Sequence, residues 1–145
     1  MSDGLHLVCP HCNGVNRLPA ERNPGEAKCG RCHEPLFDGH PANVSGAGLE
    51  AHVSRGQIPV VADFWADWCG PCHMMAPAFA EAARTMEPQV RFVKVDTEAD
   101  QQTAMRYAIR GIPTLILFRD GRELTRQSGA MSAQGIVSWL RSSLS

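Results

Sequence analysis

Residues 60–72 read Val-Val-Ala-Asp-Phe-Trp-Ala-Asp-Trp-Cys-Gly-Pro-Cys, an apolar run followed by two cysteines that are separated by two residues. The run from Val60 to Trp65 predicts a buried strand, and the Ala- and Met-rich stretch that comes next predicts a helix. The pair Cys69 and Cys72 therefore lies where a strand passes into a helix. The free N–H groups and the positive end of the helix dipole at that point favour thiolate over thiol. Because the thiolate is the reactive form, this stretch predicts a redox site.

The composition is that of a globular protein, with 145 residues, a formal net charge of −1, 43% hydrophobic and 20% charged residues. No lysine or arginine block indicates a nucleic-acid-binding surface. No stretch approaches the roughly 20 apolar residues that span a bilayer, and residues 1–6 lack the features of a signal peptide. The expected location is the reducing cytoplasm, where six cysteines indicate metal binding and catalysis rather than three disulfides.

From about residue 46 the chain alternates between strand and helix patterns. Apolar runs bounded by turn signals predict four strands, over 60–65, 90–96, 114–118 and 123–128. Apolar spacings of three and four predict four helices: one ending near Gly56, one after Cys72 with Pro77 as a kink, one from a capping box at 97–100 to about Arg110, and one opening at Ser132. Strands joined by helices pair in parallel, and a late hairpin at Asp120-Gly121 adds an antiparallel edge. The expected fold class is α/β with a mixed sheet.

The other four cysteines lie near the N-terminus, at Cys9, Cys12, Cys29 and Cys32. Their C-x2-C-x16-C-x2-C spacing is within the range of a four-thiolate zinc site, in which each C-x-x-C turns tightly and points two sulfurs at one ion. A closed shell of this kind is structural, and it supplies the folding energy that so small a core lacks. Rubredoxin-like iron, two disulfides, or replacement of one cysteine by His11 or His33 are the alternatives.

The sequence predicts three segments: a zinc-binding module at 1–37, a linker at 38–45, and the α/β domain at 46–145. The linker carries glycine and proline and merges into a first strand. Residues 1–45 hold four Lys or Arg against five Asp or Glu, and a four-thiolate zinc centre adds negative charge. The module is therefore expected to dock partners or to sense redox state rather than to bind nucleic acid.

Four segments in the right order resemble the thioredoxin family: Asp-Phe-Trp-Ala at 63–66, Trp-Cys-Gly-Pro-Cys at 68–72, Gly-Ile-Pro-Thr at 111–114 and Ser-Gly-Ala at 128–130. The resemblance covers about 100 residues, from Ser45 to the C-terminus. The double C-x-x-C module in front of it resembles the thioredoxin-2 type of bacteria. The resemblance implies a thioredoxin fold behind a small zinc-ribbon-like module, and the activity of a protein-disulfide reductase.

The resemblance also implies catalytic roles. Cys69 is the attacking thiolate, and Cys72 then resolves the mixed disulfide. Asp63 shares a strand face with apolar neighbours, so desolvation is expected to raise its pKa towards neutrality. By resemblance it accepts the proton of Cys72 through a water, with Lys94 close enough to influence its charge. The alternative for Asp63 is a solvated carboxylate at a strand end.

For substrate binding, the resemblance implies a cis Ile112–Pro113 bond beside Cys69, which leaves the Ile112 backbone free to pair with an extended peptide. The alternative is a turn that ends a helix. The surrounding contact surface is expected to comprise Trp68, Gly70, Pro71, Ile112, Pro113, Gly129 and Ala130. His73 stands where related proteins often have Lys or Arg. It is either an exposed helix residue of small effect or a group that makes thiolate stabilisation pH-dependent.

The expected partners follow from the same resemblance. Electrons come from NADPH through thioredoxin reductase, since the chain has no flavin or nucleotide fingerprint, and oxidised cytosolic proteins are the substrates. One structural Zn²⁺ is the expected cofactor, no nucleic acid or membrane is expected as a partner, and the chain is expected to be a monomer. A second hypothesis assigns the function to the module: strong oxidants convert its thiolates to disulfides, release zinc and expose a binding surface.

Overall fold

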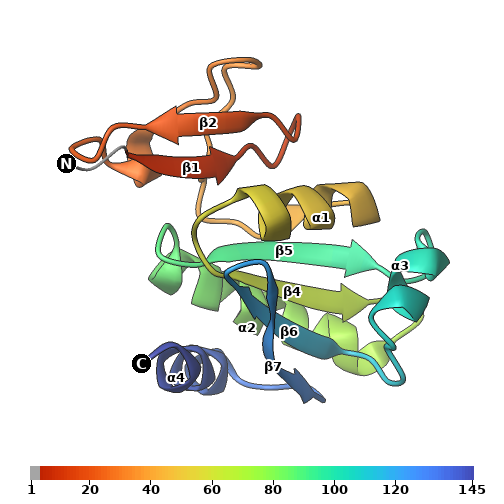
Figure 1. Cartoon of the computed structure of the whole chain (residues 1–145). Coiled ribbons are helices and arrows are strands. Elements are labelled where there is room, and N and C mark those ends of the chain that lie inside the picture. The colour runs from red at the N-terminus through yellow and green to blue at the C-terminus, as the bar shows by residue number, and fades with distance from the viewer. Residues whose placement is uncertain (1–3) are drawn as a thin grey trace.

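The computed structural model describes residues 4–145, so residues 1–3 of the expected module lie outside the described part. The N-terminal module is built on an antiparallel pair, β1 (Leu5–Val8) and β2 (Val15–Leu18), followed by a 3-10 turn at Pro24–Glu26. Its small core joins Leu7, Leu18, Leu36 and Phe37 to the buried cysteines. The module lies on one side of the larger domain, against α1 (Gly46–Arg55), as Figure 1 shows.

The larger domain is built on a five-stranded mixed sheet in the order β3-β5-β4-β6-β7. The strands are β3 (Ala42–Asn43), β4 (Val60–Trp65), β5 (Arg91–Asp96), β6 (Thr114–Arg119) and β7 (Arg122–Ser128). Strands β3, β5 and β4 are parallel, whereas β6 pairs antiparallel with β4, and β7 with β6. This confirms the mixed-sheet α/β class. The short edge strand β3 lies inside the stretch expected as a linker, because Ala42 and Asn43 pair with Val93 and Lys94.

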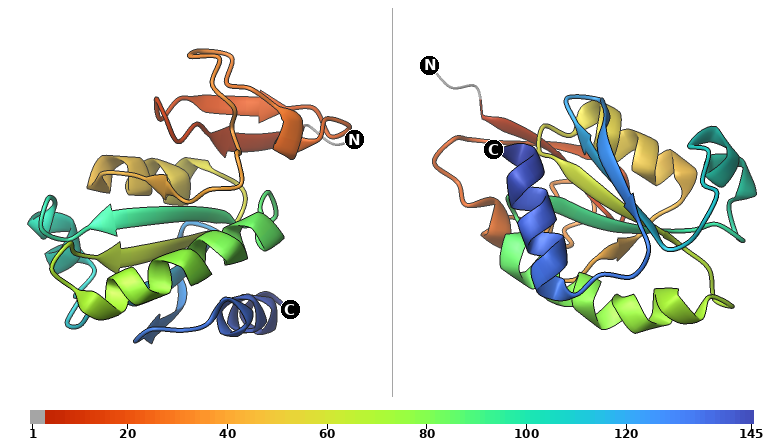
Figure 2. Two further views of the ribbon diagram at one scale, coloured as in Figure 1. Left: turned by 180° about the vertical axis from the view of Figure 1, so that it is seen from behind. Right: turned by 90° about the horizontal axis from the view of Figure 1, so that it is seen from below.

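Helices cover both faces of this sheet (Figure 2). On one face α2 (Gly70–Met86) and α4 (Ala133–Leu144) enclose a core that contains Phe79 and Phe92, whose ring centroids are 5.0 Å apart. On the other face α1 packs Leu49 against Phe64 and its neighbours. In residues 4–145 no helix is both long and apolar enough to cross a membrane.

The helix expected at 97–110 is shorter than predicted: α3 spans Gln101–Arg106, and its N-cap is Asp100. Thr97 does not cap it, because its hydroxyl and backbone N–H both donate to the Trp65 carbonyl, at 3.0 and 2.8 Å. Asp100 serves two helices. Its Oδ1 accepts from the Thr103 amide at 3.1 Å, and its Oδ2 accepts from the amide of Gly46, the first residue of α1, at 2.7 Å.

Replacing Asp100 with alanine is expected to lower the free energy of unfolding by about 1–2 kcal/mol, because it removes a helix cap. The hydrogen bonds, that from Gly46 first, lower the pKa of Asp100. Its contribution is therefore present at neutral pH and is lost as the pH falls through the lowered pKa. Urea unfolding of Asp100→Ala beside the exposed control Glu98→Ala measures the effect. Equal midpoints for the two variants would contradict the double cap.

Candidate redox site and metal centre

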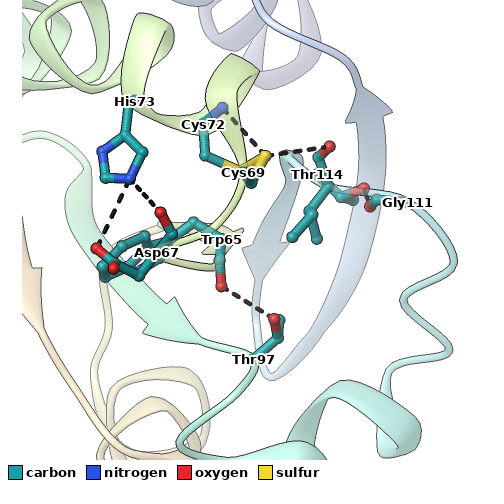
Figure 3. The surroundings of a disulfide bond; sticks show 9 residues. Trp65, Asp67, Cys69, Cys72, His73, Thr97, Gly111 and Thr114 are labelled. Carbon is teal, nitrogen blue, oxygen red and sulfur yellow. Dashed lines mark hydrogen bonds and ion pairs between the residues drawn. A yellow bond between two sulfur atoms is a disulfide. The ribbon is translucent and has the colours of Figure 1, made fainter.

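The first cysteine pair lies at the start of α2, directly after the central strand β4. Cys69 is the N-cap of α2, and its Sγ accepts a hydrogen bond from the Cys72 backbone N–H at 3.2 Å (Figure 3). Cys69 and Cys72 form a disulfide, with their Cα atoms 5.3 Å apart. Each residue is only 3% exposed, so a reaction partner must dock closely to reach the sulfur.

The loop before β6 faces this disulfide. The Ile112–Pro113 peptide bond is cis, as expected, and the Ile112 carbonyl oxygen lies 3.7 Å from Cys69 Sγ. The Thr114 hydroxyl holds the loop, since it bonds the Gly111 carbonyl and lies 3.0 Å from the Ser128 hydroxyl. The geometry brings backbone of residue 112 and a reactive sulfur together.

A groove of about 370 Å³ opens beside the disulfide. Of the expected contact surface, Trp68, Gly70, Pro71 and Ile112 line the groove with Cys69. Gly129 and Ala130 are exposed but do not line it, and Gly129 donates its N–H to the Pro113 carbonyl at 2.9 Å. The rest of the lining comes from Gly111 of the Gly-Ile-Pro-Thr segment and from four residues that sequence reasoning did not assign to the site: Thr97, Ala104, Ile109 and Arg110. No site motif marks Thr97 or the three residues at 104, 109 and 110, which the fold brings there from the segment around α3.

Asp63 lies in the middle of β4, opposite Lys94 of β5 in the strand register, and is 1% exposed. Neither carboxylate oxygen has a hydrogen-bond partner within residues 4–145. Burial raises the pKa of Asp63 to about 7, and the charge of Lys94 partly opposes the rise. The Lys94 ammonium itself lies over the Trp65 ring, 4.8 Å from its centroid. The solvated-carboxylate alternative is therefore wrong.

His73 turns towards the loop between β4 and α2 (Figure 3). Its Nε2 lies 2.6 Å from the Asp67 carbonyl oxygen and 3.7 Å from Asp67 Oδ1, and its ring meets Trp65 edge-on. The imidazole thus contacts the loop before Cys69 rather than the sulfur itself.

The remaining four cysteines form a compact cluster. The Sγ atoms of Cys9, Cys12, Cys29 and Cys32 all lie within 4.8 Å of one another. The Cys9–Cys32 and Cys12–Cys29 sulfur pairs are 3.6 and 3.7 Å apart. Four thiolates around one Zn²⁺ at about 2.3 Å give sulfur separations of about 3.8 Å, whereas a disulfide needs about 2.05 Å. The cysteines therefore fit a tetrahedral zinc ion.

Two matching backbone turns, at 9–14 and 29–34, hold these sulfurs in place. In each turn the first amide donates to the last carbonyl, at 2.9 and 2.8 Å, and the fifth amide donates back to the first carbonyl at 2.9 Å. The fifth residue is Asn13 in one turn and His33 in the other, and both adopt left-handed backbone, with φ of 62° and 68°. His33 thus completes a turn. Within the described residues the cluster contains cysteines alone.

Amide donors surround the sulfurs as well. The His11 and Arg31 backbone N–H groups donate to Cys9 and Cys29 Sγ, each at 3.3 Å. A hydrogen bond from the Cys32 backbone, stronger in effect than burial, lowers the pKa of the Cys29 thiol to about 5. The amide donors favour the thiolate, which is the metal-binding form of cysteine, whereas burial outweighs them at Cys9 and raises the pKa of that thiol to about 12.

The fold and its nearly buried disulfide define a class of protein, the thiol–disulfide oxidoreductases with a thioredoxin fold. Comparison with known proteins gives the family: the thioredoxin family model matches residues 41–142, and the chain belongs to that family. A second model, described as Thioredoxin 2, N-terminal, is that of a zinc ribbon and matches residues 8–34. Both the fold and the thioredoxin-2 resemblance are confirmed.

Named relatives agree with this assignment. The chain is 39% identical over 134 residues to thioredoxin C-3 of Corynebacterium nephridii, and the match covers 92% of each chain. It is 40% identical over 101 residues to thioredoxin of Pseudomonas aeruginosa, covering 70% of this chain and 94% of the relative. A mutant thioredoxin from Halobacterium salinarum NRC-1 shares the fold with a TM-score of 0.66 and 32% identity, over 74% of this chain and 93% of that one.

Replacing Asp63 with asparagine is expected to stabilise the oxidised protein more at pH 8 than at pH 5. With its pKa raised to about 7, the folded state keeps a proton that the unfolded chain releases near pH 4, so stability falls as the pH rises through this window. Asparagine does not titrate and so removes this loss of stability. The increase in the free energy of unfolding that the substitution causes should therefore be about 2 kcal/mol larger at pH 8 than at pH 5. Urea unfolding of both proteins at both pH values tests this. A gain that does not change with pH would show that Asp63 does not titrate in this range.

Proposed function

We propose that this thioredoxin-family protein reduces disulfide bonds of other proteins through a Cys69–Cys72 dithiol–disulfide cycle. The observation that carries the proposal is the Cys69–Cys72 disulfide at the N-cap of α2, beside an open groove. An N-cap sulfur receives the free amides and the positive dipole end of the helix, which stabilise the thiolate. The Cys72 amide already points at Cys69 Sγ.

The cycle begins with the reduced protein. The Cys69 thiolate attacks one sulfur of the substrate disulfide, forms a mixed disulfide, and releases the other substrate sulfur as a thiolate. The Cys72 thiol then gives its proton to Asp63 and attacks Cys69 Sγ. The second substrate sulfur leaves, so the substrate gains two electrons and the protein keeps the Cys69–Cys72 disulfide. A buried carboxylate with a pKa of about 7 suits this proton transfer at neutral pH, and Lys94 moderates its charge.

Substrates bind as extended segments in this proposal. The Ile112 backbone lies 3.7 Å from the reactive sulfur, so a peptide that pairs with it carries its cystine to Cys69. Trp68, which is 70% exposed, and Gly70 and Pro71 give the docking face its apolar character. The exposed Gly129 and Ala130 form its border on the β6–β7 side, whereas Pro113 is buried beneath it.

The reduced state must be regenerated from outside the chain. Each turnover leaves a disulfide, and membership of the thioredoxin family supports thioredoxin reductase with NADPH as the electron source. We propose oxidised cytosolic proteins as the acceptors of those electrons.

We propose that residues 4 to about 41 form a module that is stabilised by one structural Zn²⁺, bound by Cys9, Cys12, Cys29 and Cys32. The ion supplies folding energy and fixes the two turns. The α/β domain then begins with β3, which is earlier than residue 46, since β3 completes the sheet edge.

A second candidate function rests on the uneven exposure of these four cysteines. Cys9 and Cys29 are buried, at 0% and 1% exposed, whereas Cys12 and Cys32 are partly exposed. A strong oxidant can therefore reach two of the thiolates, release zinc and expose a partner-binding surface. Such binding would track zinc loss and would persist in Cys69→Ser.

The two cysteines of the cycle are expected to fail in different ways. Cys69→Ser should reduce insulin disulfides no faster than a sample without the protein, because the nucleophile is gone. Cys72→Ser should still attack, but should accumulate a mixed disulfide that mass spectrometry detects. The assay couples NADPH oxidation to turnover through thioredoxin reductase.

A parallel assay with dithiothreitol as the donor separates the two parts of the proposal. Turnover with dithiothreitol but not with reductase would overturn only the NADPH route. Turnover by Cys69→Ser with either donor would overturn the cycle itself.

A further inference from the structure

The N-terminal module packs directly against the larger domain. Helix α1 lies between the module and the sheet, as Figures 1 and 2 show from opposite sides. Gln57 Oε1 accepts from the His6 amide at 2.7 Å, and the Gln57 amide donates to the His6 carbonyl at 2.9 Å. A Cβ on Gly48 would lie 3.3 Å from Asn13 Oδ1, so this glycine lets the first cysteine turn approach α1. The contact is close enough for the two parts to affect each other's stability.

The charged side chain of Arg91 crosses this contact. Arg91 is the first residue of β5, yet it is only 2% exposed. Its Nη2 donates to the Leu36 carbonyl at 2.7 Å and to the Val8 carbonyl at 3.3 Å, and its guanidinium lies 3.9 Å from the centroid of the Phe37 ring. All three partners belong to the module, whereas Glu87, 3.9 Å away, belongs to the domain.

A buried guanidinium is stable only where other groups offset its desolvation. Glu87 offsets it in part, because burial raises the pKa of that carboxyl to about 7. The imidazole of His52 is also buried, and burial lowers its pKa to about 3, so it stays neutral. The module contributes the rest: two carbonyl dipoles, an aromatic face, and the net negative charge of four thiolates around one Zn²⁺. Val8 directly precedes Cys9, so Arg91 reaches the edge of the metal centre.

The residues that carry the two carbonyls lie close in sequence to the proposed metal ligands. Val8 lies immediately before the first cysteine turn, and Leu36 lies two residues after the second one ends. Both turns supply sulfurs to the proposed zinc site, so zinc binding would fix the segments that present the two carbonyls to Arg91. Without the ion, a core this small does not hold its fold, and the contacts to Arg91 are lost with it.

We propose that Arg91 is the positioning residue through which zinc binding by the module and the stability of the thioredoxin domain support each other. Coupling between two equilibria is reciprocal. Zinc therefore raises the melting temperature of the domain, and docking of the module on Arg91 tightens zinc binding. The inference rests on the proposed zinc site and is independent of the Cys69–Cys72 cycle.

The test compares the intact parent protein with Arg91→Met and with Arg122→Met, a control at an exposed arginine on β7. Equilibrium competition against a zinc chelator of known affinity measures the zinc dissociation constant. We expect Arg91→Met to weaken zinc binding about tenfold or more, which corresponds to about 1.4 kcal/mol. Arg122→Met should stay within about twofold of the parent. Parent-like zinc affinity in Arg91→Met would overturn the proposal.

Thermal unfolding with and without zinc separates coupling from ordinary loss of stability. In the parent, zinc should raise the melting temperature, and in Arg91→Met this rise should shrink by about half or more. If the substitution lowers both melting temperatures equally, Arg91 stabilises only the domain and the proposal is wrong.

Should Arg91→Met fail to fold, Arg91→Gln is the second variant, because it keeps an amide donor without the charge. Parent-like zinc affinity in that variant would likewise overturn the proposal, and weakening of about fivefold would support it. A parent that binds no zinc would remove its basis while leaving the disulfide cycle untouched.

Discussion

The start of α2 is the constraint on which the redox chemistry depends. Strand β4 is central in the sheet, between β5 and β6, so the chain that leaves it has to turn and begin a helix above the sheet edge. The N-cap of that helix is where unpaired amides point outward, and Cys69 occupies it. Because β6 runs antiparallel to β4 and pairs Thr114 with Phe64, the cis Ile112–Pro113 bond arrives at the same edge. The sheet topology thus brings the Cys69 sulfur close to the Ile112 backbone, with which we propose that the substrate pairs.

The same C-x-x-C spacing occurs at two kinds of site in one chain, and the backbone around the cysteines differs between them. At the start of α2 the helical turn directs two sulfurs towards each other, and they form a disulfide. In the N-terminal turns a left-handed fifth residue closes the loop, and the sulfurs approach sulfurs of the other turn, Cys9 with Cys32 and Cys12 with Cys29. The first geometry allows a two-electron exchange between dithiol and disulfide, and the second suits a tetrahedral ion. The larger domain holds the second site in place through Arg91, which lies at the opposite end of β5 from Asp96 and the redox site.

Local sequence pattern predicts those parts of the structure that local forces determine. Alternation of strands and helices, the cysteine spacings and the burial of Asp63 follow from periodicity and from apolar neighbours. Long-range contacts decide the rest. The strand β3 has two residues and exists only by pairing with β5. Thr97 bonds the Trp65 carbonyl and so leaves the cap of α3 to Asp100. Arg110 lines the groove beside Cys69 only because the fold brings together segments that are distant in sequence. The burial of Arg91 likewise depends on distant segments, and an arginine within a strand pattern does not indicate which residues it will contact.

We propose that the six cysteines divide into one cycling pair and four metal ligands. Native mass spectrometry of protein purified without chelator, before and after mild reduction, tests it most directly. We expect one bound zinc and a gain of only two hydrogens on reduction, from the Cys69–Cys72 disulfide. A protein without metal that gains six hydrogens would hold three disulfides, and that result would contradict the division of the cysteines.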